Sequence, residues 1–193
     1  MAIQIDDAGW GSLVGGTIIG AYREETGEAA FAMIPVEMFQ GEAFARKDYA
    51  AGAVAAAQAV LTELGHRHDE PITICTGFVL DGIREYLEKT GYCWQSGKIT
   101  GPLQELIETR FLEELQKIGV KGVNYETLTE KQGLFFWLCV KWLKNGNLNG
   151  KAAPEKERLV KTGWGTYHIW SALPYDKAKV AAKRFKAAAR ARY

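Results

Sequence analysis

The stretch IQIDDAGWGSLVGGTIIGAYR, residues 3–23, places two adjacent carboxylates directly before a run of glycines. Residues 2–7 predict a short strand that enters a glycine-rich bend, and the β-prone residues at 16–23 are typical of a second strand. After the turn EETGE, the run AAFAMIPVEMF at 29–39 predicts a returning strand. The glycines are therefore followed by a β-hairpin and not by a helix.

The paired carboxylates Asp6 and Asp7 need an explanation, because like charges repel and ordered glycine is entropically costly. A dinucleotide-binding loop is disfavoured, since its glycines must lead into a helix N-terminus that binds the pyrophosphate. A phosphate-binding hairpin of the actin-like ATPase type is disfavoured because it needs two such halves. A two-metal site for phosphodiester hydrolysis fits better, with carboxylates holding Mg²⁺ or Mn²⁺ and glycines admitting a nucleic-acid backbone. A plain turn is the structural alternative, because Asp is common in turns.

The rest of the chain alternates between helix-like and strand-like segments. The expected elements are an alanine-rich helix at 43–64, a strand at 72–80, a helix at 102–118, an aromatic helix at 129–146, a late strand at 162–170 and a basic helix at 174–193. A hairpin followed by this alternation predicts an α/β fold, with a mixed β-sheet flanked by helices. The length of 193 residues predicts a single domain, 1–193, with a helical insertion at about 100–150.

Composition and charge narrow the class of protein. The chain is 47% hydrophobic and 24% charged, and it has no apolar run of the roughly 20 residues that span a bilayer and no visible signal peptide. Its three cysteines are widely spaced, which favours reduced thiols in the cytoplasm over a disulfide framework or a zinc site. The net charge is +1, yet residues 176–193 carry +6. This tail is expected either to hold phosphates or to be a solvated helix.

The segment DDAGWGSLVGG, residues 6–16, resembles the first motif of the type 2 ribonucleases H, which is D-E-A-G-R-G followed by a few residues and then Gly-Pro. The matching positions are Asp6, Ala8, Gly9, Gly11 and Gly15. Asp7 stands where the family has Glu, Trp10 where it has Arg, and Gly16 where it has Pro. The resemblance implies a ribonuclease H-like fold in which Asp6 and Asp7 bind metal. It also implies that Gly9, Trp10 and Gly11 contact the substrate near its 2′-OH.

The resemblance implies two more carboxylates, which this sequence matches less well. The type 2 enzymes have an Asp at the end of a central strand, where VLDG supplies Asp81. They have another at a helix start, where IETRFLEEL has Thr109 and leaves Glu105 or Glu108. The structural alternatives are a helix cap for Asp81 and a solvated helix face for the two glutamates.

The type 1 ribonucleases H offer a second template. They place a Glu near the start of the first long helix, where Glu37 or Glu42 stands in this chain. They also place an Asp at the end of the fourth strand. Here that position is Cys75, Thr76 or Gly77, none of which is an adequate Mg²⁺ ligand.

These residues together predict a metal-dependent nuclease that hydrolyses RNA, or the RNA strand of an RNA–DNA hybrid, by two-metal chemistry. The predicted catalytic residues are Asp6, Asp7, Asp81, Glu37, Glu42 and Glu108, of which Asp6, Asp7 and Asp81 are the predicted ligands of Mg²⁺ or Mn²⁺. Lys183 and Arg184 in the terminal helix are expected to hold backbone phosphates. The alternative is a catalytically inert ribonuclease H-like binding or assembly module, which the missing Arg and the displaced carboxylates favour.

Other features have ordinary structural explanations. The Phe- and Trp-rich helix at 129–146 fits a face turned to the core much better than a base-stacking platform, with a homodimer interface as the alternative. His66 and His68 lie in a polar loop and are expected at the surface, and His168 is expected to pack within the late strand. The expected partner is thus nucleic acid and not a membrane.

Overall fold

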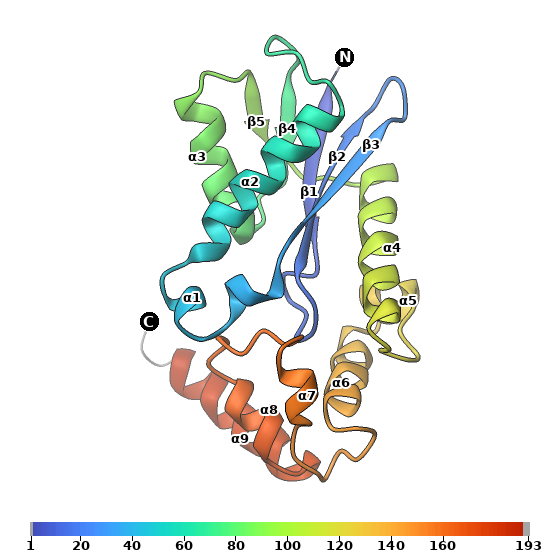
Figure 1. Cartoon of the computed structure of the whole chain (residues 1–193), viewed down its shortest axis with the longest axis vertical. Coiled ribbons are helices and arrows are strands. Elements are labelled where there is room, and N and C mark those ends of the chain that lie inside the picture. The colour runs from blue at the N-terminus through green and yellow to red at the C-terminus, as the bar shows by residue number, and fades with distance from the viewer. Residues whose placement is uncertain (1, 191–193) are drawn as a thin grey trace.

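A computed structural model describes residues 2–190 (Figure 1). Within them, five strands form one sheet in the order β3-β2-β1-β4-β5. The strands are β1 (Ile3–Ala8), β2 (Thr17–Arg23), β3 (Ala29–Ile34), β4 (Ile72–Ile74) and β5 (Trp94–Ser96). The first three pair antiparallel, whereas β4 pairs parallel with both β1 and β5. The predicted α/β class, a mixed sheet flanked by helices, is therefore confirmed.

Helices cover both faces of this sheet (Figure 1). On one face lie α2 (Asp48–Glu63) and α3 (Asp81–Lys89), and on the other lies α4 (Pro102–Lys117). Alternation along β1 explains the two layers, since Ile3 and Ile5 belong to the core under α2, whereas Ala8 belongs to the core under α4. Gly20 of β2 lets α4 approach closely, because a Cβ there would lie 2.9 Å from Cδ1 of Ile107.

A second group of helices, here called the helical lobe (residues 124–190), lies beyond the carboxyl end of β1 (Figure 1). Its helices are α5 (Tyr125–Thr129), α6 (Gln132–Leu143), α7 (Pro154–Glu157), α8 (Tyr167–Ala172) and α9 (Tyr175–Arg190). The segment after α7 binds the glycine-rich loop, since the backbone N–H of Gly15 donates to Leu159 and that of Lys161 donates to Leu13, both at 2.9 Å. The lobe is thus attached directly to the loop that follows the paired carboxylates.

Four predicted elements differ from the structure. The strand predicted at 29–39 ends at Ile34, and Val36–Phe39 form the 3₁₀ helix η1. The second is the helix predicted at 43–64. It is two helices, α1 (Gly41–Ala45) and α2, because Lys47 takes the left-handed conformation with φ 62°. The break lets the Phe44 ring pack against Tyr49, with ring centroids 5.5 Å apart. A composition that favours helix does not indicate a contact of this kind.

The predicted strand at 72–80 ends early, at Ile74. The Arg84 side chain donates hydrogen bonds to the carbonyls of Cys75, at 2.6 Å, and Gly77, at 3.3 Å. These carbonyls thus accept hydrogen bonds from a side chain and not from a neighbouring strand. The chain then continues as a short 3₁₀ helix, η2 (Phe78–Leu80). Strand β5, which is three residues long, was not among the predicted elements.

The late strand predicted at 162–170 is wrong, because most of this segment forms α8. Tyr167 and Trp170 both pack against the core under α4. They are three positions apart, which is the spacing of a helix face and not of a strand face. His168 is consequently exposed in the first turn of α8 and does not pack within a strand. The predicted basic helix at 174–193 is present as α9, and residues 191–193, including Arg192, lie outside the described residues.

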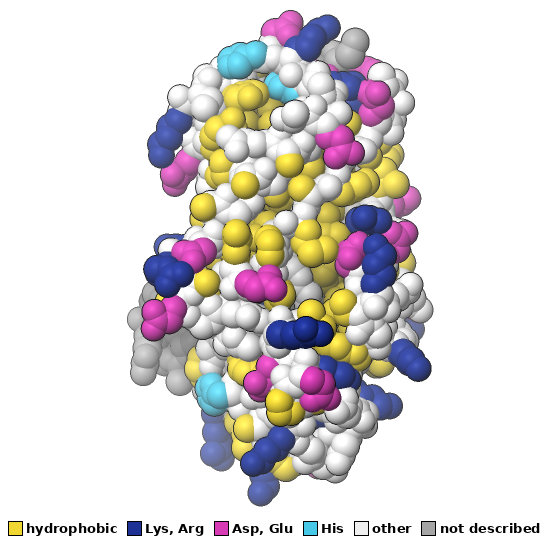
Figure 2. Space-filling model, viewed as in Figure 1, with side chains coloured by type: hydrophobic (Ala, Val, Ile, Leu, Met, Phe, Trp, Pro, Cys, Tyr) yellow, Lys and Arg dark blue, Asp and Glu magenta, His cyan; other side chains and the backbone are white. Residues whose placement is uncertain are grey.

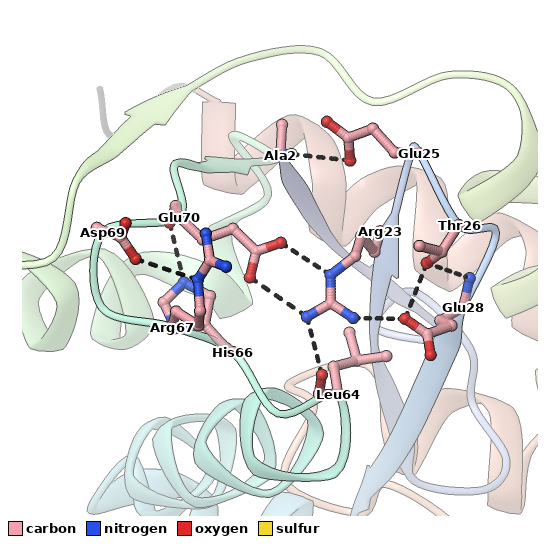
Figure 3. Close-up of polar contacts among 10 residues, drawn as sticks. All are labelled: Ala2, Arg23, Glu25, Thr26, Glu28, Leu64, His66, Arg67, Asp69 and Glu70. Carbon is pink, nitrogen blue, oxygen red and sulfur yellow. Dashed lines mark hydrogen bonds and ion pairs between the residues drawn. The ribbon is translucent and has the colours of Figure 1, made fainter.

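The end of the sheet away from the helical lobe is held by a buried ion pair (Figure 3). Arg23, the last residue of β2, donates from Nε to Glu70 at 2.8 Å and from Nη2 to the carbonyl of Leu64 at 2.8 Å. Glu28 accepts from the same guanidinium. Strand β2 is thereby tied to the end of α2 and to the loop that enters β4. Among the described helices, none is long and apolar enough to cross a membrane.

Candidate functional site

Asp6 and Asp7 lie in β1 and point to opposite faces of the sheet, as alternation requires. Asp6 pairs across the strands with Gly20, on the face covered by α4. Its carboxylate accepts the backbone N–H of Asp7 at 2.8 Å. Burial raises the pKa of Asp6, and the negative charge of Glu108 on α4 raises it further. The two acids predicted at this point are therefore held on different faces, and Asp6 is the one that faces Glu108.

Asp7 is turned toward the opposite face, near the loop after β4. A Cβ at Gly77 would lie 2.8 Å from Oδ1 of Asp7, so this glycine leaves the space that the carboxylate occupies. Burial and the charge of Asp6 raise the pKa of Asp7 to about 7, although the nearby ammonium of Lys161 acts in the other direction.

Lys161 is a buried cation under the glycine-rich loop. Its Nζ donates hydrogen bonds to the carbonyl of Gly9 at 2.5 Å, to that of Trp10 at 3.3 Å and to Oγ1 of Thr17 at 3.0 Å. It also lies over the Phe39 ring, 4.6 Å from the centroid. Burial lowers its pKa, whereas the carboxylate of Asp7 favours its charged form. Sequence analysis missed this residue, because an isolated lysine carries no signal of burial.

The residue directly after β4 is Cys75, and it faces Asp6. The backbone N–H of Cys75 donates to Ile5 at 2.9 Å, which continues the pairing of β4 with β1. A hydrogen bond from its thiol to Asp6 lowers the pKa of that carboxyl, and burial raises the pKa of the thiol. The end of β4 therefore carries a neutral thiol and not a carboxylate, as the sequence at residues 75–77 indicates.

The other predicted carboxylates do not join Asp6. Asp81 is the first residue of α3, is half-exposed and forms an ion pair with Arg84. Glu37 lies in the 3₁₀ helix η1 (Val36–Phe39) and lines a different cavity, of 240 Å³, together with Gly15 and Gly16. Glu42 lies in α1 with its side chain 96% exposed. Of these candidates, only Glu108 is brought to Asp6.

The set of acidic side chains does not fit a pair of bound divalent cations. Two-metal hydrolysis needs several carboxylates, one of which bridges both ions. Among residues 2–190, no three Asp, Glu, His or Cys side chains come together as a group that could hold a metal ion. Asp6 and Glu108 provide two carboxylates, while the third position is a thiol and Asp7 is directed to the other face.

The space around the glycine-rich loop is largely filled by other parts of the protein. Gly9 has φ +90°, and a Cβ there would lie 2.4 Å from the ring of Phe111. At Gly16 a Cβ would lie 2.3 Å from the carbonyl oxygen of Ile34. Both glycines thus allow close internal packing. Gly11, by contrast, is exposed and has open space around the position of its missing Cβ.

Trp10, predicted to contact substrate, lies in an aromatic cluster. Its ring centroid is 5.2 Å from that of Tyr49, 5.8 Å from Trp164 and 5.9 Å from Phe39. The side chain is half-buried and packs against the core under α2. Most of its aromatic surface is therefore taken up by neighbouring rings.

Two adjoining hollows open beside the glycine-rich loop. The first, here called the acidic pocket, has a volume of 370 Å³ and is lined by Asp7, Gln104 and Glu108 among others. The second, here called the aromatic cleft, has a volume of 820 Å³. Its aromatic lining is Phe136, Trp137, Trp164, Trp170 and Phe185. The two hollows share four lining residues: Gly11, Leu13, Gln132 and Phe136.

One lining residue of each hollow carries a buried side-chain atom that has no hydrogen-bond partner among the described residues. These atoms are Oε2 of Glu108, in the lining of the acidic pocket, and Nε1 of Trp164, in that of the aromatic cleft. The aromatic helix was predicted to face the core. Phe135 does so, but Phe136 and Trp137 are only partly buried and line the cleft. The helical spacing alone did not distinguish these two roles.

Positive charge is concentrated in the second part of the chain. Residues 1–116 contain 8 Lys or Arg against 18 Asp or Glu, whereas residues 117–193 contain 16 against 5. Figure 2 shows several Lys and Arg side chains at the lower end of the molecule, over the helical lobe. Lys183 and Arg184 are exposed on α9, next to Phe185 at the aromatic cleft. The excess of positive charge therefore extends over residues 117–193 and is not confined to the tail at 176–193.

Comparison of the sequence with protein-family models and with curated proteins finds no match. Among solved structures, the chain is similar to the catalytic core domain of BIV integrase, with 15% sequence identity and a TM-score of 0.33. The match covers 96% of this chain and 97% of the integrase chain. A likeness at this level has no bearing on the chemistry of the site.

Proposed function

We propose that this chain is a ribonuclease H-like module that binds nucleic acid and lacks two-metal hydrolysis. The observation that carries the proposal is the pairing of Asp6 with Cys75 at the ends of β1 and β4. A neutral thiol is a poor ligand for Mg²⁺, a hard cation that prefers oxygen. With a thiol at this point, the site lacks the negative charge that two divalent cations need.

Lys161 supports the same conclusion on the other face of β1. Its ammonium offsets the negative charge of Asp7, and its hydrogen bonds to the carbonyls of Gly9 and Trp10 fix the loop from beneath. A fixed internal cation reduces the attraction that Asp7 offers to a metal ion. Of the two acids before the glycines, Asp7 is thus partly offset by a charge of the protein itself.

The charge of residues 117–193 supports a polyanionic partner. Nucleic-acid binding draws most of its affinity from cations that neutralise phosphates and release counterions. The exposed cations of α9, which include Lys179, Lys183 and Arg184, provide such groups. Binding is expected to weaken steeply as salt is raised.

Metal-dependent cleavage of RNA or of an RNA–DNA hybrid is the second candidate function. It is favoured by the closeness of Asp6 to Glu108 and by the unpartnered oxygen of Glu108 in the acidic pocket. Two carboxylates on one face suffice to attract a single cation, although they do not complete the predicted set.

The test incubates the purified chain with labelled single-stranded RNA, RNA–DNA hybrid and duplex DNA, with Mg²⁺ or Mn²⁺, and measures both binding and cleavage. We expect salt-dependent binding without cutting by the wild type or by Asp6→Asn. Cutting that requires metal and disappears in Asp6→Asn would overturn the proposal in favour of the nuclease. Absence of binding to all three nucleic acids at low salt would overturn it as well.

A further inference from the structure

We infer that the aromatic cleft receives unpaired bases of a single-stranded nucleic acid, whose phosphates lie along the exposed cations of α9. This inference rests on the proposed nucleic-acid binding and adds the location and the strandedness of the ligand. Five aromatic side chains, contributed by α6, α8, α9 and the segment before α8, converge on the cleft. For the two rings of α6, the sequence favours a core face or a homodimer interface over base stacking.

Several rings of the cleft meet edge to face. Trp137 and Trp170 have centroids 5.5 Å apart and planes at 90°, and Phe136 meets Trp170 at 4.9 Å and 72°. In an edge-to-face pair, one of the two rings keeps both faces clear of that partner, although Tyr175 covers part of Trp137, with ring centroids 4.4 Å apart. Phe136, Trp137 and Trp170 are only partly buried and line the cleft, so each keeps some aromatic surface open. Stacking of a base on such a face is tolerant of sequence, because every base presents a π surface.

The cleft also has the size and the polar groups of a ligand site. Its volume of 820 Å³ falls within the roughly 300–1,000 Å³ that is typical of small-molecule pockets. Gln132 and Thr166 lie in its lining and supply polar groups for base edges.

Charge favours a nucleic acid over an apolar partner. Phe185, which is 42% exposed at the edge of the cleft, directly follows Lys183 and Arg184 on α9. On the same helix, Lys177 and Arg184 line a groove next to α8. An aromatic surface bordered by cations matches a strand that presents bases on one side and phosphates on the other. A duplex, whose bases are stacked internally, cannot use these rings.

The test measures binding of a fluorescein-labelled single-stranded oligonucleotide by anisotropy, with RNA and DNA versions and a matched duplex. Trp fluorescence of the protein is recorded in parallel. We expect single strands to bind at least tenfold more tightly than the duplex and to quench Trp emission. The RNA and DNA arms show whether the 2′-OH contributes.

The informative variant is Phe185→Ala, because an exposed ring can be removed with little effect on folding. Its matched control is Leu106→Ala, which removes an apolar side chain that is 41% exposed on α4 and does not line the aromatic cleft. We expect Phe185→Ala to weaken single-strand binding about fivefold to tenfold, with Leu106→Ala unchanged. A double variant, Lys183→Glu with Arg184→Glu, is expected to weaken binding further and to flatten its salt dependence.

Two outcomes separate this inference from the proposed function. Binding of duplex and single strand with equal affinity, or full binding by Phe185→Ala, would overturn the cleft assignment and leave nucleic-acid binding in place. Failure to bind any nucleic acid would overturn both. Concentration-dependent dimerisation that is lost in Phe185→Ala, together with absent binding, would assign the cleft to a second copy of the chain.

Discussion

The ammonium of Lys161 donates a hydrogen bond to the carbonyl of Gly9, which lies 152 positions earlier in the chain. Through this contact the helical lobe fixes the loop that follows the paired carboxylates. The same amino group donates to two further acceptors and lies over an aromatic ring, and these contacts partly offset the cost of burying a charge. The site is therefore organised around a buried lysine.

Replacing Lys161 with Met should destabilise the protein by about 2–3 kcal/mol, because it leaves buried carbonyls without their donor. The side chains have similar length, so loss of packing is small. Urea unfolding followed by circular dichroism measures the change in the free energy of unfolding. Lys151→Met, at an exposed position, is the control and should change it by less than about 0.5 kcal/mol. Equal stability of Lys161→Met and wild type would contradict the role assigned to this cation.

Two glycines of the loop make a matched pair for substitution by alanine. Gly9→Ala should cost about 2–4 kcal/mol, because the residue has a positive φ and its Cβ would overlap the ring of Phe111. Gly11→Ala should leave stability nearly unchanged, since its surroundings are open. Thermal unfolding compares the two variants. If both lowered the melting temperature equally, the loop would be constrained by something other than the packing of Gly9.

Cys75→Asp should give the site affinity for a divalent cation, because it adds a carboxylate beside Asp6 on the face that also receives Glu108. We expect Mn²⁺ to raise the melting temperature of this variant and not that of the wild type. A ligand at 100 times its Kd stabilises the folded state by about 2.7 kcal/mol, which is readily measured. Cys93→Asp, at an exposed thiol, is the control. An equal response of wild type and variant to Mn²⁺ would show that the thiol does not limit metal binding.

The ion pair between Arg23 and Glu70 should make stability depend on acid pH (Figure 3). The guanidinium of Arg23 lowers the pKa of Glu70 in the folded state. Its contribution is therefore complete above the pKa of an unfolded Glu, about 4.3, and is lost as the pH falls through the lower folded value. Glu70→Gln should cost about 3 kcal/mol at pH 7, since both partners are buried.

This cost should begin to shrink as the pH falls below about 4, where Glu70 is protonated first in the unfolded chain, and it is lost as the pH falls through the lower folded pKa. Urea unfolding at pH 7 and pH 3 measures the difference between variant and wild type. Glu63→Gln, at an exposed position on α2, is the control and should behave as the wild type at both values. A cost for Glu70→Gln that is the same at pH 7 and pH 3 would show that packing, and not charge, accounts for it.

Much of the sheet could be predicted from local sequence. The run from Ile3 to Arg23 alternates apolar residues and breaks at glycines, and the structure has strands at 3–8 and 17–23. The helix predicted at 102–118 matches α4, because its apolar residues recur at helical spacing and Pro102 marks its start. Cys75, Thr76 and Gly77 were also identified as an inadequate strand end for metal binding.

The sequence by itself determined the strands and helices whose signals are local, and with them the mixed sheet and the position of Asp6 and Asp7 at the end of β1. Tertiary structure alone decided which acids meet. Glu108 reaches Asp6 because α4 packs on that face, whereas Asp81 pairs with Arg84 at the surface. It also decided that Lys161 is buried, and that partly exposed rings such as Trp137 and Trp170 form one cleft. Burial and charge pairing depend on contacts between distant segments, and no local pattern of residues records them.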